Sequence, residues 1–386
     1  MVSSNMFPQL AAHVLDALNV SEGEAIYISG GAHQQEFLEE LGIQVARRGG
    51  QPFITAVSND YQKRLLETCS VDQLKRTPKI LKGALEAMDK YIVIEPYSDP
   101  SFKTQFREKL QARSEGMYPI LQIIYSKPGK PWIYMGWATE GMARMYGVSL
   151  AVLEQLVIGG CNIDYNKLRA DCEHVMSVLS GARRVHITDR HGTDFLLDIE
   201  GRRLNADDGM WSEEKAAQGD TGGNLPAGEV FVAPVETKGE GMIYCPVTID
   251  DLTRSVLIKG ALLYFKDGML VLEKCTAKEG QDILRDTLAK FVEIDMQKYG
   301  APNALKVAEL GIGLNPVIDR SIGYILTDEK IGGSVHVAFG MSESFGGAIM
   351  SNMHWDFVTA PDETVEVEYR DGSKRLLMKD GKLLRK

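Results

Sequence analysis

The chain has 386 residues, and its 43 basic and 53 acidic side chains give a formal net charge of −10. This length suggests two domains with buried cores, and the acidic balance disfavours nucleic acid and anionic membranes as partners. We expect no export signal and no membrane anchor, since no apolar run approaches the roughly 18 residues that span a bilayer. Five scattered cysteines without a C-x-x-C pair favour a reducing, cytoplasmic compartment.

The first part of the chain, residues 1–180, alternates helical and strand-like patterns. Such alternation is typical of an α/β domain, which we predict here. The expected helices lie near residues 10–18 and 37–50, and the expected strands lie near 24–31, 52–57, 91–96 and 118–126.

A strand followed by glycines and a helix occurs at residues 24–37, EAIYISGGAHQQEF. This is the general setting of a phosphate-binding turn. The segment lacks both G-x-G-x-x-G and the P-loop lysine, so we interpret it as a tight strand-to-helix connection. His33 is then expected at the helix start without a catalytic role.

The second part, residues 181–386, changes to consecutive short strands with hairpin signals. One helix, near residues 278–299, interrupts them. This pattern predicts an α+β domain. The expected strand pairs flank the turns at 190–193 and 266–268, and further hairpins lie within 365–384.

Acidic residues and histidines recur in apolar, glycine-punctuated segments of this second part. They are Glu229, Glu309, His336, His354 and Asp356. Each alone is most often a cap, a surface group or a hydrogen-bonded core residue. Burying all of them together costs free energy unless their charge is compensated, and a shared cation supplies this compensation. His354 and Asp356, two apart in an expected strand, share one face.

Imidazole with carboxylate suits zinc, manganese, cobalt or iron, and the absence of cysteine from the set argues against a closed structural zinc site. Five candidate ligands exceed what one open catalytic ion usually takes from a protein. Two ions that share a bridging carboxylate are therefore the favoured arrangement, and such pairs activate water for hydrolysis.

Four motifs carry a family resemblance. The chain reads NLPAGEV at 224–230, ELGIGLN at 309–315, DEKIGGSVHVAFG at 328–340 and HWD at 354–356. These resemble, in the same order, the motifs N-x-P-x-G-E-V, E-L-G-I-G-x-N, D-E-K-x-x-G-x-x-H-x-A-x-G and H-W-D of the aminopeptidase T and aminopeptidase S family of thermophilic-type metalloaminopeptidases. The resemblance spans most of the chain.

The resemblance implies an N-terminal α/β domain and a C-terminal domain that bears a dinuclear centre, in homodimers that enclose the active sites. It implies two divalent ions, which are zinc, cobalt or manganese. The family's metal ligands fall on Glu229, Glu309, His336, His354 and Asp356. The family also has a tyrosine ligand after its first histidine, and Glu343 occupies the equivalent position here. Glu343 is either a solvated loop acid or a group that faces the metals.

We therefore expect a cytoplasmic metalloaminopeptidase, a hydrolase that removes N-terminal residues from short peptides through a metal-activated water. Glu309 is the candidate bridging carboxylate, and Glu343 is the candidate general base. We therefore expect both residues to be catalytic.

Two alternatives use the same residues differently. In a related group that resembles 2,5-dihydroxypyridine ring-cleaving dioxygenases, one Fe(II) ion is held by two histidines and an aspartate. His336, His354 and Asp356 would form such a facial triad. The second alternative is a catalytically silent member that acts as a peptide-binding or assembly protein, for which the changed tyrosine position is the support.

Overall fold

The computed structural model describes residues 4–125, 129–250 and 252–385, and the chain divides into two compact units. Unit 1 contains the chain up to Asn162 together with Gly209–Pro226, and unit 2 contains Ile163–Asp208 together with Ala227–Lys386. This division differs from the sequence-based boundary between residues 180 and 181, because the chain passes from one unit to the other more than once. The division into units depends on pairing between segments that are distant in the sequence, and local sequence patterns do not predict such pairing.

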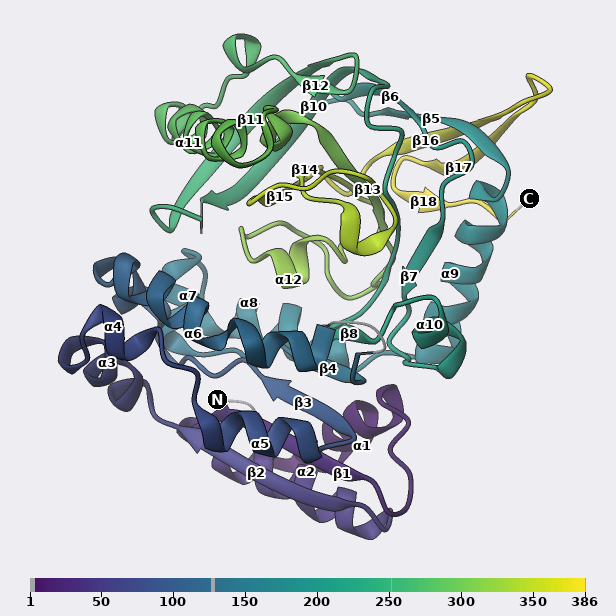
Figure 1. The fold of residues 1–386 in the computed structure, drawn as a ribbon. Coiled ribbons are helices and arrows are strands. Elements are labelled where there is room, and N and C mark those ends of the chain that lie inside the picture. The colour runs from purple at the N-terminus through teal and green to yellow at the C-terminus, as the bar shows by residue number, and fades with distance from the viewer. Residues whose placement is uncertain (1–3, 126–128, 251, 386) are drawn as a thin grey trace. The chain divides into compact units, whose positions relative to one another are not determined.

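Unit 1 is an α/β unit, as the alternating pattern predicts (Figure 1). Its strands are β1 (Ala25–Gly31), β2 (Gln51–Val57), β3 (Lys90–Ile94), β4 (Trp132–Met135) and β8 (Gly222–Leu225). Its α-helices are α1 (Phe7–Ala17), α2 (Gln35–Arg47), α3 (Asn59–Thr68), α4 (Val71–Leu74), α5 (Lys79–Ala87), α6 (Arg107–Tyr125), α7 (Glu140–Met145), α8 (Leu150–Glu154) and α10 (Glu213–Ala217). Short η elements are η1 (Ser4–Met6), η2 (Ala32–Gln34), η3 (Pro100–Gln105) and the π-helical η4 (Gln155–Gly159).

The unit 1 sheet has the order β2-β1-β3-β4-β8, and every neighbouring pair is parallel. Helix α2 packs on β1 and β2, whereas α5 and α6 cover Tyr27 of β1 through Leu85 and Ile120. Helices thus lie on both faces of the sheet, as in doubly wound folds, and the edge strand β2 stays partly exposed. The strand β8 extends the sheet beside β4, which explains why Gly209–Pro226 belongs to unit 1.

One predicted strand of this unit is wrong, since residues 118–125 form the end of α6. The buried residues of this helix are Ala112, Gly116, Ile120 and Ile124, which recur every four positions. A four-residue spacing places them on one helical face, and the short apolar run alone does not distinguish a buried helix end from a strand.

Unit 2 contains mostly antiparallel strands, as expected for its α+β pattern. The strands are β5 (Ala182–Thr188), β6 (Asp194–Asp198), β7 (Leu204–Asp207), β9 (Glu229–Val232), β10 (Gly239–Asp250), β11 (Val256–Lys266), β12 (Met269–Leu270), β13 (Val307–Gly313), β14 (Val335–Gly340), β15 (His354–Val358), β16 (Thr364–Tyr369), β17 (Lys374–Lys379) and β18 (Lys382–Leu383). The helices are α9 (Tyr165–Leu179), α11 (Gln281–Tyr299) and α12 (Ile325–Asp328), with η5 (Leu272–Lys274), η6 (Asn303–Leu305) and η7 (Glu343–Phe345).

Two sheets form the core of unit 2. One has the order β12-β11-β10-β6-β5-β16-β17-β18, and the other has the order β15-β14-β13-β9-β7. Rings from both sheets meet between them, with Phe265 of the larger sheet 5.7 Å from Phe339 of the smaller, which in turn stacks on Phe357. The predicted hairpins at 190–193 and 266–268 and the C-terminal hairpins are confirmed.

None of the helices formed by the described residues combines the length and the apolar character that a bilayer crossing requires.

Candidate metal centre

The smaller sheet of unit 2 gathers all five predicted ligands on one face. Glu309 on β13 lies opposite Ala338 on β14, and Ala338 lies opposite Asp356 on β15. Residues directly opposite each other in neighbouring strands point to the same face, as do residues two apart within a strand. The same two rules place His336 (opposite Gly311), Glu229 (opposite Gly313) and His354 (two from Asp356) on that face.

Small residues between the ligands leave the space that the ligands fill. A Cβ atom added to Gly311 would lie 1.9 Å from Cε1 of the His336 ring, so only glycine fits opposite this histidine. At Gly313, an added Cβ would lie 2.1 Å from the backbone oxygen of Ile331. The glycines of ELGIG therefore allow side chains and backbone to pack closely around Glu309.

The carboxylate of Glu309 faces both histidines, one with each oxygen. Its Oε1 lies 3.4 Å from Nε2 of His336, and its Oε2 lies 3.3 Å from Nε2 of His354. Glu229 Oε2 lies 3.4 Å from His336 Nε2, and Asp356 Oδ1 lies 3.5 Å from His354 Nε2. Two groups of potential ligands result, and Glu309 belongs to both. They are Glu229 with Glu309 and His336, and Glu309 with His354 and Asp356.

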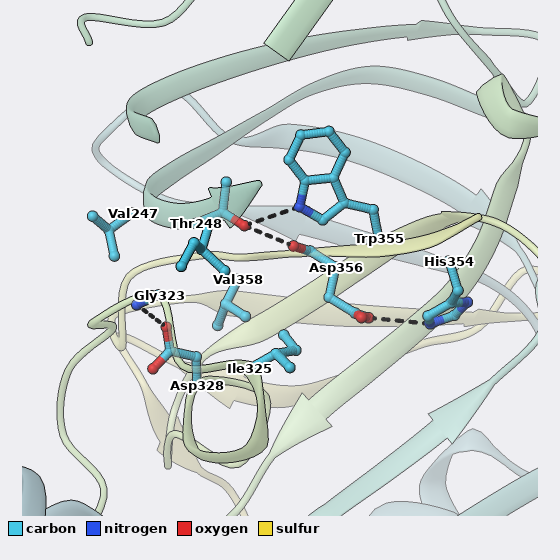
Figure 2. A pocket seen from close by; sticks show the side chains of 10 residues that line it. Val247, Thr248, Gly323, Ile325, Asp328, His354, Trp355, Asp356 and Val358 are labelled. Carbon is cyan, nitrogen blue, oxygen red and sulfur yellow. Dashed lines mark hydrogen bonds and ion pairs between the residues drawn. The ribbon is translucent and has the colours of Figure 1, made fainter. Parts of the chain in front are cut away.

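The His354 end of this arrangement is the more open one, because its side chain is 25 % exposed whereas that of His336 is fully buried. Figure 2 shows His354 and Asp356 side by side on a small pocket of about 50 Å³, with the indole of Trp355 directed to the other side. Thr248 donates to the backbone oxygen of Asp356 and accepts from the Trp355 indole, which fixes the strand that carries the two candidate ligands.

A backbone contact also sets the orientation of His354. Its Nδ1 lies 2.8 Å from the carbonyl oxygen of Met341, a distance at which Nδ1–H donates to that oxygen. This hydrogen bond leaves Nε2 as the nitrogen that faces Glu309 and Asp356. Metal-binding histidines are commonly held by such a second hydrogen bond.

The ionisation of the cluster follows from burial and pairing. Burial alone would raise the pKa of Glu309, but hydrogen bonds with His336 and His354 outweigh it and lower the pKa to about 2. Burial opposes a charge on His336, yet Glu309 and Glu229 raise its pKa to about 9. Burial also opposes a charge on His354, and Asp356 with Glu309 raises its pKa well above the usual value. The acids and the two imidazoles of the cluster thus favour each other's charged forms.

Three residues that the sequence analysis did not single out complete the site. Lys330 is fully buried, and its ammonium lies 2.5 Å from Glu229, 2.8 Å from Glu329 and 3.3 Å from Asp207. The side chain of Glu329 is 16 % exposed, and its carboxylate belongs to a third group with His336 and Asp356. Glu329 and Lys330 lie in the sequence DEK at 328–330, and a lysine next to an acid in an otherwise buried segment is the signal that could have identified these two residues.

The residues present fit a divalent cation. Glu229 Oε2 and Asp356 Oδ1 are buried and make no hydrogen bond to any described residue, although each faces a histidine nitrogen. Orphaned carboxylate oxygens are costly unless a cation compensates them. The donor atoms of each group lie within 4.8 Å of one another, and they are carboxylate oxygens and imidazole nitrogens, which suit zinc, manganese, cobalt or iron.

Glu343 lies apart from this cluster, in contrast to its predicted catalytic role. It begins η7, its side chain is exposed, and it belongs to none of the three potential metal-binding groups found among the described residues. Phe345, two positions later, packs its ring edge-on against His354 instead, with the ring centroids 5.7 Å apart. The loop directs an aromatic ring at the site and the acid to solvent.

Comparisons with known proteins agree with this geometry. The sequence matches the family described as thermophilic metalloproteases (M29) over residues 7–383. Wild-type AmpT from Thermus thermophilus is similar in structure, with a TM-score of 0.76 and 18 % identity over 99 % of each chain. The 2,5-dihydroxypyridine dioxygenase of Pseudomonas putida KT2440 is also similar, with a TM-score of 0.61 and 15 % identity over 100 % of this chain and 99 % of the other. No curated protein matches the sequence.

Proposed function

The chain belongs to the M29 family of thermophilic metalloproteases, and from this premise we propose that it is an aminopeptidase that removes N-terminal residues from short peptides. As a member of this family, the protein is a metal-dependent hydrolase of peptide bonds. The observation that carries the proposal is the position of the Glu309 carboxylate, because one of its oxygens faces His336 and the other faces His354. A carboxylate so placed suits two ions that share it.

We propose that two ions of zinc, cobalt or manganese are held by the five predicted ligands. Glu229 and His336 would serve one ion, His354 and Asp356 the other, and Glu309 both. When bound, such ions lower the pKa of water and polarise a carbonyl oxygen. The partly exposed His354 marks the end that a peptide can approach, since the opposite end is closed by Lys330 and its acids.

Glu329 takes the role of general base in this proposal, in place of Glu343. Its carboxylate lies among the ligand atoms of His336 and Asp356 and is partly exposed, whereas Glu343 points to solvent. Lys330 donates to Glu329 at 2.8 Å and so holds the carboxylate in place while it accepts a proton from the attacking water. Lys330 acts here as a positioning residue.

The alternative of a single Fe(II) ion rests on the fold shared with the dioxygenase. It requires His336, His354 and Asp356 to converge on one point. None of the three groups found among the described residues contains both histidines, because Glu309 stands between them. The geometry therefore favours the two-ion aminopeptidase.

The test is hydrolysis of a leucyl reporter peptide by the metal-loaded protein, with its N-acetylated form as the control. We expect release of leucine from the free form only, and two divalent ions per chain by elemental analysis. Glu329→Gln should keep both ions and lower kcat by about 10²- to 10⁴-fold. One iron per chain with oxygen consumption on 2,5-dihydroxypyridine would instead establish the dioxygenase, and two ions without turnover of any peptide would indicate a silent binding protein.

We further propose that the protein acts in the cytoplasm as a homodimer and binds neither nucleic acid nor membranes. The net charge of −10 disfavours nucleic acid and anionic membranes, and the dispersed cysteines favour the cytoplasm, whereas the homodimer rests on the family resemblance alone. Light scattering after gel filtration measures the oligomeric state, and a mass of one chain, 42.7 kDa, would contradict the dimer.

A further inference from the structure

Unit 1 contains a cavity of about 650 Å³ that the metal chemistry does not use. All its lining residues lie between Phe7 and Leu150, so it belongs to unit 1 alone. The volume is in the range of small-molecule sites. The position of the cavity in the fold, the residues of its walls and its charge together indicate which ligand it binds.

The cavity lies at the switch point of the doubly wound sheet. The chain runs from β1 outward to β2 and then returns to the other side of β1 to form β3. Residues that follow the carboxyl ends of three central strands line the cavity, namely Ala32 after β1, Ser98 after β3 and Trp137 after β4. In open α/β sheets, ligands bind in the crevice outside the carboxyl ends of the strands at this point.

One wall of the cavity is aromatic. The ring of Trp137 lies 5.0 Å from that of Phe37 and 6.2 Å from that of Phe7, and the two phenylalanine rings are 5.4 Å apart. The three rings come from different elements, the loop after β4, α2 and α1, and they are fixed by mutual packing. Phe37 is fully buried and Trp137 is 6 % exposed, so the partly exposed Phe7, with a small part of Trp137, forms the accessible surface of this wall. Exposed aromatic surface accepts apolar groups and also attracts organic cations.

The remaining lining carries an excess of negative charge. Arg144 pairs with Asp99 at 3.1 Å, so these two charges cancel, and partial burial lowers the pKa of His33, which favours its neutral form. Glu36 and Glu140 are left, both exposed. Each lies in the first turn of a helix, whose amino end offsets only about half a unit of charge. The net potential favours a cation.

We propose that this cavity binds a small organic ammonium ion with an apolar or aromatic group attached. The rings hold the apolar part, and Glu36 and Glu140 attract the ammonium group. Free amines and the amino termini of peptides share this chemistry. The site is independent of the metal centre and of the reaction proposed for it.

The probe is phenethylamine, compared with neutral 2-phenylethanol and anionic 3-phenylpropionate, each titrated against the full-length metal-loaded protein while tryptophan fluorescence is recorded. Cation–π and exposed ion-pair energies together predict that phenethylamine binds about 5- to 30-fold more tightly than the alcohol. The fluorescence change should vanish in Trp137→Phe, which locates the ligand. Equal affinity for amine and alcohol, or tighter binding of the carboxylate, would overturn the proposal.

The double variant Glu36→Gln with Glu140→Gln should remove most of the preference for the amine. Glu108→Gln is the matched control, because Glu108 is an exposed first-turn acid of α6 outside the cavity. A loss of preference in the control as large as in the double variant would refute the assigned role of the two acids. Metal content and peptidase activity, measured in parallel, separate failure of this site from failure of the metal centre.

Two further ligands distinguish the sources of the ammonium group. Phe-Gly amide and its N-acetyl form are titrated in the presence of a chelator, which prevents cleavage. Binding of the free dipeptide with the same dependence on Glu36 and Glu140 assigns the site to peptide amino termini. Binding of phenethylamine alone assigns it to free amines. Binding of the acetylated form as tightly as the free form would contradict both assignments.

Discussion

Lys330 places its ammonium 2.5 Å from the carboxylate of Glu229, with no exposed surface on the lysine side chain. Glu229 Oε1 is thereby neutralised, and Oε2 remains directed at His336. Burial raises the pKa of Glu229 to about 8 in spite of the lysine. The lysine thus holds one oxygen of this candidate ligand, while the other oxygen stays available to a cation.

Lys330→Met should destabilise the metal-free protein strongly. The substitution leaves Glu229, Glu329 and Asp207 buried together without their cation, and removal of one partner from a buried pair costs about 3–5 kcal/mol. Urea unfolding measures the loss. Lys259→Met is the control, since the exposed pair of Lys259 with Glu279 contributes at most about 1 kcal/mol. Similar losses in both variants would show that Lys330 does not stabilise the buried acids.

Gly311→Ala should weaken metal binding without any change of a ligand. The new Cβ would lie 1.9 Å from the His336 ring and must displace it. Disturbance of ligand orientation costs about 10- to 100-fold in metal affinity, which competition with a chromophoric chelator measures. Gly83→Ala, in α5, serves as the control because its Cβ meets no atom within 4 Å and should leave affinity unchanged. Unaltered affinity in Gly311→Ala would mean that His336 is not a ligand.

Glu309→Gln and Glu343→Gln should behave in opposite ways. Glu309 faces both histidines, so its loss should lower metal content and reduce kcat/KM by at least about 100-fold. Glu343 is exposed and lies apart from the cluster, so its variant should retain activity within about twofold, the range of surface substitutions. A large loss of activity with intact metal content in Glu343→Gln would restore the role that the sequence comparison gives this residue.

Stability should fall as the pH rises, because of a buried carboxyl outside the metal centre. Burial, and then the neighbouring Asp189, raise the pKa of Glu363 from its usual 4.5 to about 9. The folded chain keeps this proton where the unfolded chain loses it. The contribution is therefore complete below pH 4.5 and is lost as the pH rises towards 9, with a slope of at most about 1.4 kcal/mol per pH unit.

Unfolding in urea between pH 5 and pH 9 checks this expectation. Glu363→Gln should flatten the decline, because a neutral amide has no proton to lose. Glu366→Gln, which removes a partly exposed acid of β16 that pairs with Lys374, should keep the wild-type slope. The explanation is wrong if wild type and Glu363→Gln lose stability in parallel.

Much of the architecture follows from local pattern. The alternation of helices and strands specified an α/β unit and the hairpin signals specified an antiparallel one, because residue periodicity is a local consequence of backbone geometry. The failure at residues 118–125 has the same origin. A short apolar run is consistent with both the helical and the strand period. Burial of Ile120 and Ile124 on one side of α6 decided in favour of the helix.

The sequence by itself determined which residues are candidate metal ligands, since buried acids and histidines in apolar strands are costly enough to be conspicuous: Glu229, Glu309, His336, His354 and Asp356. Only the tertiary structure decided how they are arranged. Strand register brings the two oxygens of Glu309 to two different histidines. The segments between strands place the ammonium of Lys330 against Glu229 and leave Glu343 exposed. Such relations depend on pairing between segments far apart in the chain, whose alignment no local pattern encodes.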